Sequence, residues 1–215
     1  METLELLPIR VRITSILRKA IYAGEYRSGD ELSLTDVAAQ LGVSRTPIRT
    51  ALSRLAHDGL IEQIPNRGSY VTKPTEEDFR SVFEARKLVE TAAFRKALRA
   101  HTEGTVELLK ENLAKQEALE KRFDLNEYVS LNRTFHLLLT RDAGNPYYEK
   151  YLDELYNRIS TYLLFWDTSA DNSRSLRSHK RMFEAFCEQD EEKGIEALLE
   201  DISLGEGDIE KSRGL

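Results

Sequence analysis

Two short helical patterns separated by one glycine constrain the fold of this chain more than any other feature. The first pattern spaces its apolar residues at i, i+3, i+4 and i+7: Leu34, Val37, Ala38 and Leu41. Gly42 follows directly, where a left-handed residue can end a helix. Ser44 stands where it can cap a second pattern, which continues at helical spacing to Leu55. Two short helices joined by a tight glycine turn predict a helix-turn-helix.

The residues on either side extend this motif. Apolar residues recur at helical spacing from Ile13 to Ile21, which predicts a helix that ends near Gly24. After the motif, residues 60–64 and 69–72 are two β-prone runs joined by a turn that contains Gly68. A hairpin in this place is a wing. The first segment is therefore predicted to be a winged helix-turn-helix of three helices and a two-stranded wing.

The second helix of the motif would direct its polar residues away from its apolar face. With Arg45 at zero, Arg49 lies at about 40° and Thr46 at about 100°, whereas the apolar residues centre at about 290°. Arginine side chains match guanine edges and phosphates, and hydroxyl groups match phosphates. On an isolated helix such arginines would indicate a solvated surface, but within this motif they predict a DNA-reading face. Arg54 lies on the flank of this face, and two interpretations are open for it: a contact with a phosphate, or a solvated charge.

Charge is distributed unevenly along the chain. The net charge of −6 over 215 residues would by itself argue against nucleic-acid binding. Residues 1–73, however, hold 10 Lys and Arg against 8 Asp and Glu, whereas residues 74–215 hold 21 against 29. No acidic residue lies between Val37 and His57. We therefore predict a DNA-binding domain over residues 1–73 and an acidic second domain over residues 74–215.

The first segment resembles the GntR family of bacterial transcription regulators. The resemblance rests on Leu41-Gly42-Val43-Ser44-Arg45-Thr46-Pro47-Ile48-Arg49 and on Asn66-Arg67-Gly68-Ser69-Tyr70-Val71, and it extends over residues 8–72. It implies that Arg45 and Arg49 read the operator, and that Arg67 and Gly68 lie at the wing tip. Thr35 and Thr50 differ from residues common in the family, which affects the operator sequence expected. The predicted DNA-binding residues are Thr35, Ser44, Arg45, Thr46, Arg49, Arg67 and Gly68.

The remainder of the chain predicts an all-helical bundle, which makes the protein mainly α. Its first long amphipathic helix carries Arg86 and Glu90 on the apolar stripe. Because a buried, unpaired arginine is very costly, two interpretations are open: an internal pair with Glu90, or contact with an anionic ligand inside the bundle. Residues 205–215 are polar and contain glycine, and we expect them to form a frayed tail.

Polar residues on two further stripes indicate a metal site. Asn132 and His136 lie one helical turn apart on one apolar stripe, and His179 lies on another. A buried histidine is commonly a hydrogen-bonded core residue, so that interpretation stays open beside the metal site. Imidazole nitrogens together with an oxygen ligand suit a divalent transition ion. Arg86 nearby would favour a carboxylate ligand.

This second segment resembles the FadR-type C-terminal (FCD) effector domain. The resemblance rests on Asn132-Arg133-Thr134-Phe135-His136, on Gly144-Asn145, and on His179 at the head of a helix, over about residues 75–204. Metal-binding members carry Asp or Asn followed by three His, and Asp201 stands here in place of the third His. An angular count puts Asp201 on the flank of the apolar stripe of its helix. Two alternatives therefore remain: a metal site with altered affinity for the ion, and a metal site that is partly lost. The implied ligands of a Zn, Ni or Mn ion are Asn132, His136, His179 and Asp201.

These patterns predict a ligand-responsive transcription regulator that binds a palindromic operator as a homodimer. Its DNA affinity would be modulated by a small organic acid, bound near Arg86 with or without the metal. The chain has one cysteine, no apolar run long enough to span a membrane and no signal-peptide pattern, so we expect a cytoplasmic protein. Two alternatives from other classes are open. One is a metal-dependent hydrolase, although the chain shows no evident base paired with a nucleophile, and the other is an architectural DNA binder without an effector.

Overall fold

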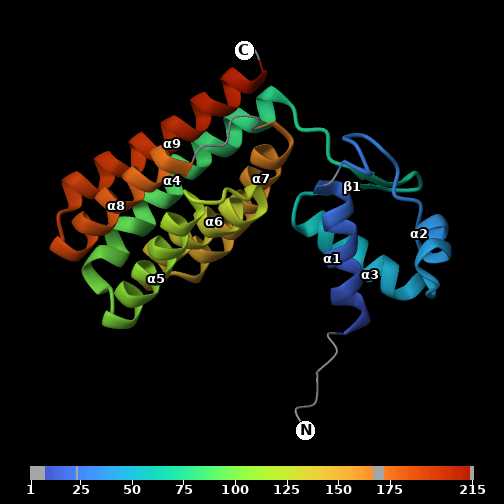
Figure 1. Ribbon diagram of the computed structural model, residues 1–215, viewed down its shortest axis with the longest axis horizontal. Coiled ribbons are helices and arrows are strands. Elements are labelled where there is room, and N and C mark those ends of the chain that lie inside the picture. Colours follow the sequence, from blue (N-terminus) through green and yellow to red (C-terminus); the bar gives the residue numbers. More distant parts are fainter. Residues whose placement is uncertain (1–7, 23, 167–171, 214–215) are drawn as a thin grey trace, which may run out of the picture. The chain divides into compact units, whose positions relative to one another are not determined.

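The computed structural model describes residues 8–22, 24–166 and 172–213 and divides into two compact units, Met1–Thr75 and Glu76–Leu215. The predicted fold class is confirmed, because a winged helix-turn-helix precedes an all-helical unit (Figure 1). Among the described helices, none is both long enough and apolar enough to cross a membrane.

The N-terminal unit forms the predicted three helices and wing. Its elements are α1 (Ile9–Tyr22), α2 (Leu34–Leu41), α3 (Arg45–His57), β1 (Ile61–Ile64) and β2 (Gly68–Val71). The hydroxyl oxygen of Ser33 accepts a hydrogen bond from the backbone N–H of Asp36 and so caps α2. Gly42 ends α2 with φ of 65°, in the left-handed conformation that the motif requires. The turn between α2 and α3 therefore forms as the sequence predicts.

The wing is an antiparallel hairpin that also pairs with a preceding segment. Its register places Ile61 opposite Val71 and Ile64 opposite Gly68. An isolated bridge joins Glu31 to Tyr70, and nearby the N–H of Leu32 donates to a β2 carbonyl oxygen. This additional pairing, which the sequence did not predict, ties the segment before α2 to the wing.

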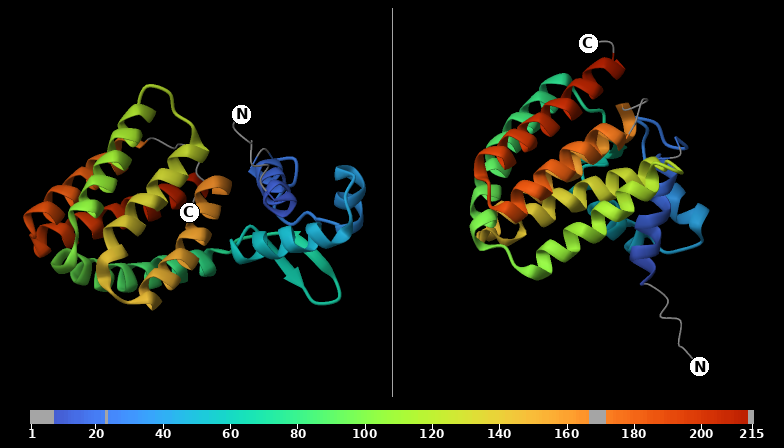
Figure 2. Two further views of the ribbon diagram at one scale, coloured as in Figure 1. Left: turned by 90° about the horizontal axis from the view of Figure 1, so that it is seen from below. Right: turned by 60° about the vertical axis from the view of Figure 1, so that its left-hand side comes forward.

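Six α-helices and one short 3-10 helix make up the described part of the C-terminal unit. They are α4 (Glu76–Ala100), α5 (Glu103–Leu119), α6 (Leu125–Thr140), η1 (Arg141–Ala143), α7 (Pro146–Trp166), α8 (Asn172–Glu188) and α9 (Glu191–Arg213). Helix α4 contacts α6, α7 and α9, and α8 packs along α9 (Figure 2). The approach of α4 and α9 is close, since a Cβ on Gly194 would lie 2.5 Å from the ring of Phe94.

The last helix extends further than the sequence predicts. The expected frayed tail is wrong for residues 205–213, because α9 continues to Arg213, and residues 214 and 215 lie outside the described residues. The ammonium group of Lys87 on α4 lies 2.6 Å from a carboxylate oxygen of Glu206 on α9. Helix α9, which packs against α4 and α8, thus runs past Gly205 and Gly207, although glycine costs roughly 1 kcal/mol relative to alanine inside a helix.

Candidate DNA-binding surface and buried polar cluster

Helix α3 has one buried apolar side and one exposed polar side. The buried side chains are Ile48, Ala51, Leu52 and Leu55. Arg45, Thr46 and Arg49 are all exposed on the other side. Within the described part of the chain, no ion pair or side-chain hydrogen bond involves Arg45 or Arg49. Both guanidinium groups are thus available to an external partner.

The start of α3 differs in one detail from the sequence prediction. Ser44 occupies the N-cap position with an extended backbone, but its side chain makes no capping hydrogen bond. Its exposed hydroxyl group therefore remains available, as does that of Thr35 on α2.

Arg54, on the flank of α3, belongs to a local ion-pair group. Its Nε lies 3.2 Å from a carboxylate oxygen of Asp58, which also pairs with Arg18 on α1. Asp58 is buried, whereas the Arg54 side chain remains 61% exposed. This arrangement ties the end of α3 to α1 and leaves much of the Arg54 guanidinium in solvent.

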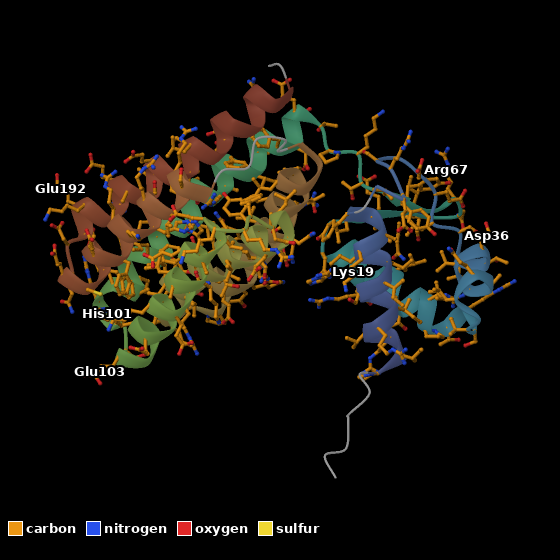
Figure 3. All side chains as sticks on the ribbon, in the orientation of Figure 1. Lys19, Asp36, Arg67, His101, Glu103 and Glu192 are labelled. Atoms are coloured by element: carbon orange, nitrogen blue, oxygen red, sulfur yellow. The ribbon has the colours of Figure 1, made fainter. Side chains whose placement is uncertain are left out.

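The wing tip depends on a glycine. Gly68 has φ of 140°, and a Cβ there would lie 2.9 Å from Oε1 of Glu31, so a larger residue would be strained. Arg67 lies in the exposed turn beside it and carries its charge outward (Figure 3). The hydroxyl group of Tyr70 donates to the carbonyl oxygen of Arg67 at 3.2 Å. The structure thus places the two predicted wing residues together at the hairpin turn.

The C-terminal unit contains a buried polar cluster, which we define as Arg86, Glu90, His136, His179 and Asp201. Nε2 of His136 on α6 lies 3.2 Å from Nε2 of His179 on α8. The carboxylate of Asp201 on α9 lies 3.2 Å from His136 Nε2 and 3.6 Å from His179 Nε2. Both imidazoles are fully buried and Asp201 is 6% exposed. Three potential metal ligands from three helices therefore meet in the core.

The orientation of the two imidazoles fits metal binding through Nε2. Nδ1 of His136 is 2.7 Å from Oε1 of Glu90, and Nδ1 of His179 is 2.7 Å from Oε1 of Gln116. An acceptor at each Nδ1 holds a proton there, so Nε2 is the nitrogen that would ligate an ion. Ligand atoms bound to one tetrahedral zinc at about 2.0–2.1 Å lie roughly 3.3 Å apart, close to the spacing seen here. The residues present thus fit a divalent ion.

The pKa values of the two histidines shift in opposite directions. Burial lowers the pKa of His179 to about 3, so this imidazole is neutral. Burial also acts to lower the pKa of His136, but the carboxylates of Glu90 and Asp201 together outweigh it and raise that pKa. Burial alone would raise the pKa of Asp201, yet its hydrogen bond to His136 and the neighbouring positive charges hold it below the usual value. Asp201 is therefore an ionised carboxylate.

Asn132 lies at the edge of the cluster and reaches it through a serine. Its Nδ2 donates to Oγ of Ser175 at 3.1 Å. That Oγ lies 3.3 Å from His179 Nε2 and 3.4 Å from Asp201 Oδ1. The fourth predicted ligand is therefore adjacent to the other three and separated from them by one hydroxyl group.

Arg86 forms the internal pair that the sequence allowed. Its Nε donates to Oε2 of Glu90 at 2.8 Å, and its Nη2 lies 3.5 Å from Asp201 Oδ2. The hydroxyl group of Tyr156 donates to the same Glu90 carboxylate, and the guanidinium carbon lies 4.8 Å from the Tyr156 ring centroid. Arg86 and Asp201 also line a small cavity of about 40 Å³. The guanidinium is thus both paired and next to a cavity.

Three residues that complete this region were missed from the sequence, and a fourth was given only part of its role. Gln116, Tyr156 and Ser175 went unrecognised, and Glu90 was recognised only as a partner of Arg86. Gln116 offered one usable signal, because Asn112 and Gln116 stand one turn apart on the stripe that also holds Leu109 and Leu113. Such polar residues on an apolar stripe indicate buried hydrogen bonds.

Comparison with known proteins gives consistent matches over both units. Residues 9–71 match the model of the bacterial regulatory proteins of the gntR family, and residues 81–203 match the FCD domain. The HTH-type transcriptional repressor RspR of Escherichia coli is 31% identical over 91% of this chain and 88% of its own length. The gluconate operon transcriptional repressor of Bacillus subtilis is 27% identical over 87% of this chain and 79% of its own. The solved structure of E. coli McbR/YncC shares the fold, with a TM-score of 0.79 and 19% identity over 97% of this chain and all of that one.

Proposed function

Because the chain belongs to the GntR family of bacterial regulatory proteins and carries an FCD domain, we propose that it is a ligand-responsive regulator that binds a palindromic operator as a homodimer. Family membership makes it a DNA-binding transcription regulator and not an enzyme, so the hydrolase alternative is set aside. In the proposal, residues 1–73 read DNA, and residues 74–215 bind the effector and dimerise.

One observation carries the DNA-reading part of the proposal: Arg45 and Arg49 are exposed on α3 without an internal partner. Their guanidinium groups would read guanine edges in the major groove, while the hydroxyl groups of Ser44, Thr46 and Thr35 would contact phosphates. Arg67 and Gly68 at the wing tip would approach the minor groove, where a narrow A·T-rich segment attracts cations. A two-fold protein dimer would match two half-sites of a palindrome.

Exposed apolar side chains of the C-terminal unit support dimerisation through this unit. Leu88 on α4 is 70% exposed, and Tyr147 and Tyr151 on α7 are also exposed. A second copy of the chain would remove such side chains from water, which is favourable at roughly 25 cal/mol per Å² of apolar surface.

We propose that the buried polar cluster holds a divalent ion through His136, His179 and Asp201, with Asn132 beside them. When bound, the ion would act as a Lewis acid that takes a carboxylate oxygen at an open coordination position. The two imidazoles and one carboxylate suit Zn, Ni or Mn. Glu90 and Gln116 would keep the imidazoles in the ligating orientation.

The proposed effector is a small organic acid bound near Arg86. With neutral imidazoles, Arg86, Glu90 and Asp201 leave one excess negative charge in the core. A divalent ion would reverse its sign, and a monocarboxylate would then restore neutrality, which favours binding both together. The cavity of about 40 Å³ is far smaller than the roughly 300–1,000 Å³ of ordinary ligand pockets, so side chains must move to admit an acid.

This rearrangement would couple the effector to DNA binding through the connection between the units. Arg86 and Glu90 lie on α4, which begins at Glu76, and β2 of the wing ends at Val71. A ligand that favours one arrangement of α4 would shift the population of DNA-binding states through residues 72–75. An architectural DNA binder, in contrast, would show no thermal shift with any metal or metabolite.

The substitution Arg49→Ala tests the proposed function. A bidentate arginine–guanine pair contributes about 1–3 kcal/mol, so its loss from two half-sites should cost about 2–6 kcal/mol and abolish specific binding. The measurement is titration of a DNA duplex that the unmodified chain selects from a random-sequence library. Arg27→Ala is the matched control, because Arg27 is exposed in the same unit but outside α3. Unchanged affinity of the Arg49→Ala variant would refute the assignment of α3 as the reading helix.

A further inference from the structure

A groove between α1 and α3 of the N-terminal unit is rich in arginine. It has a volume of about 420 Å³, and its lining residues are Arg10, Val11, Thr14, Ser15, Arg18, Thr50 and Arg54. Three of these seven residues are arginines, three carry hydroxyl groups, and none is acidic. The hydroxyl groups of Thr14 and Thr50 donate to carbonyl oxygens of their own helices, so the guanidinium groups are the main donors that an anion would meet here.

The charge of this groove is only partly neutralised within the protein. Buried Asp58 pairs with both Arg18 and Arg54 and therefore offsets one of the three charges. Arg10 is exposed and has no ion pair within the described part of the chain. The groove keeps an excess of positive charge, and Arg10 is the residue freest to meet an external anion.

The groove is continuous with the DNA-reading side of α3. On the same angular scale that puts Thr46 at about 100°, Thr50 lies at about 140° and Arg54 at about 180°. Residues of α1 extend this surface, because Arg10, Thr14 and Arg18 follow one another at intervals of four and share a helix face. A recognition helix in the major groove has phosphates along both of its sides. The groove lies on the side of α3 that ends at Arg54.

We propose that this groove binds the phosphate backbone of the operator, with Arg10 as its main contact. The proposal rests on the proposed entry of α3 into the major groove and adds a second helix, α1, to the DNA-binding surface. The partner is DNA because the groove combines an excess of arginine with continuity to the reading helix. A phosphate contact positions the protein without reading sequence.

The substitution Arg10→Gln tests this proposal, and Arg12→Gln is a matched control. Arg12 has the same charge and is also exposed on the first turn of α1, but it does not line the groove. Loss of one phosphate contact in each protomer, two per dimer, should lower the slope of log affinity against log salt by about 1.8 and weaken binding about 25- to 100-fold at 0.1 M salt. We expect this effect in Arg10→Gln and not in Arg12→Gln, for both the selected duplex and a duplex of unrelated sequence.

The outcomes separate this proposal from the proposed function. If Arg49→Ala abolishes specific binding while Arg10→Gln and Arg12→Gln behave alike, DNA reading by α3 stands and the groove is not a phosphate contact. If Arg10→Gln changes only the response to an effector, the groove serves a contact within the protein and the proposal is overturned. If Arg49→Ala has no effect, the proposed function itself fails. Circular dichroism of each variant confirms that these exposed substitutions leave the fold intact.

Discussion

Replacement of Glu90 by Gln should destabilise the helical unit strongly. The Glu90 carboxylate is fully buried and accepts hydrogen bonds from Arg86 Nε, His136 Nδ1 and the hydroxyl group of Tyr156. A glutamine side chain keeps one acceptor oxygen but places an N–H₂ donor against these donors. It also removes the negative charge that faces the buried guanidinium of Arg86.

The expected loss in the free energy of unfolding depends on the partners that Arg86 retains in the Glu90→Gln variant. Breaking a buried ion pair by neutralising one partner costs about 3–5 kcal/mol, because the other charge is left uncompensated. Here Asp201 Oδ2 still lies 3.5 Å from Arg86 Nη2, and so retains part of the compensation. We therefore expect the free energy of unfolding to fall by about 3 kcal/mol, at the lower end of this range. For a chain of this size that corresponds to a decrease in Tm of roughly 6–12 °C.

Far-UV circular dichroism during urea or thermal unfolding measures this loss in the full-length chain. Most of the described helical residues belong to α4–α9, so the signal reports chiefly on the helical unit. Glu107→Gln is the matched control, because Glu107 is 66% exposed and pairs with Lys110 at 3.6 Å. An exposed pair of this kind contributes about 0–1 kcal/mol. A Glu90→Gln variant as stable as the control would refute the argument that this carboxylate balances Arg86.

Two further predictions concern the metal. Native mass spectrometry of the full chain should show a dimer that carries a divalent ion, and His136→Ala combined with His179→Ala should release the ion; an ion-free parent protein would contradict the metal proposal. Gln116→Leu should lower the affinity for Zn²⁺ about 10- to 100-fold in competition with a chelator, because His179 Nδ1 loses the acceptor that orients it. Equal affinities in the variant and the parent would show that Gln116 does not orient this ligand.

Local patterns were enough to predict most of the N-terminal unit. Each signal there acts over a few residues: Ser33 caps α2, Gly42 turns the chain, and Gly68 allows the wing turn. The pairing of Glu31 with Tyr70 was missed because it joins segments about 40 residues apart and leaves no periodic trace. In the helical unit, periodicity correctly predicted that His136 and His179 face the core.

Asp201 shows where an angular count fails. The count placed Asp201 on the flank of its apolar stripe, yet its side chain is buried among α4, α6 and α8. A helical wheel considers the packing of one helix against one neighbouring helix, and it therefore predicts that a residue on the flank is exposed to solvent. Helix α9 instead contacts three helices, α4, α7 and α8, so its flank is also covered. The number of neighbours of a helix is a tertiary property that its own sequence does not encode.

The ligating histidines are easier to predict from the sequence than the residues that orient them. His136 and His179 are unusual residues on apolar stripes, and each is visible in its own helix. Glu90 and Gln116 acquire their roles from α4 and α5, whose register against α6 and α8 decides which imidazole each one meets. A useful sequence rule follows: a core-facing histidine implies a core-facing acceptor on another helix, because a buried Nδ1–H without a partner would cost about 1–3 kcal/mol. Applied to this chain, the rule directs attention to the polar residues on the apolar stripes of α4 and α5, where Glu90 and Gln116 lie.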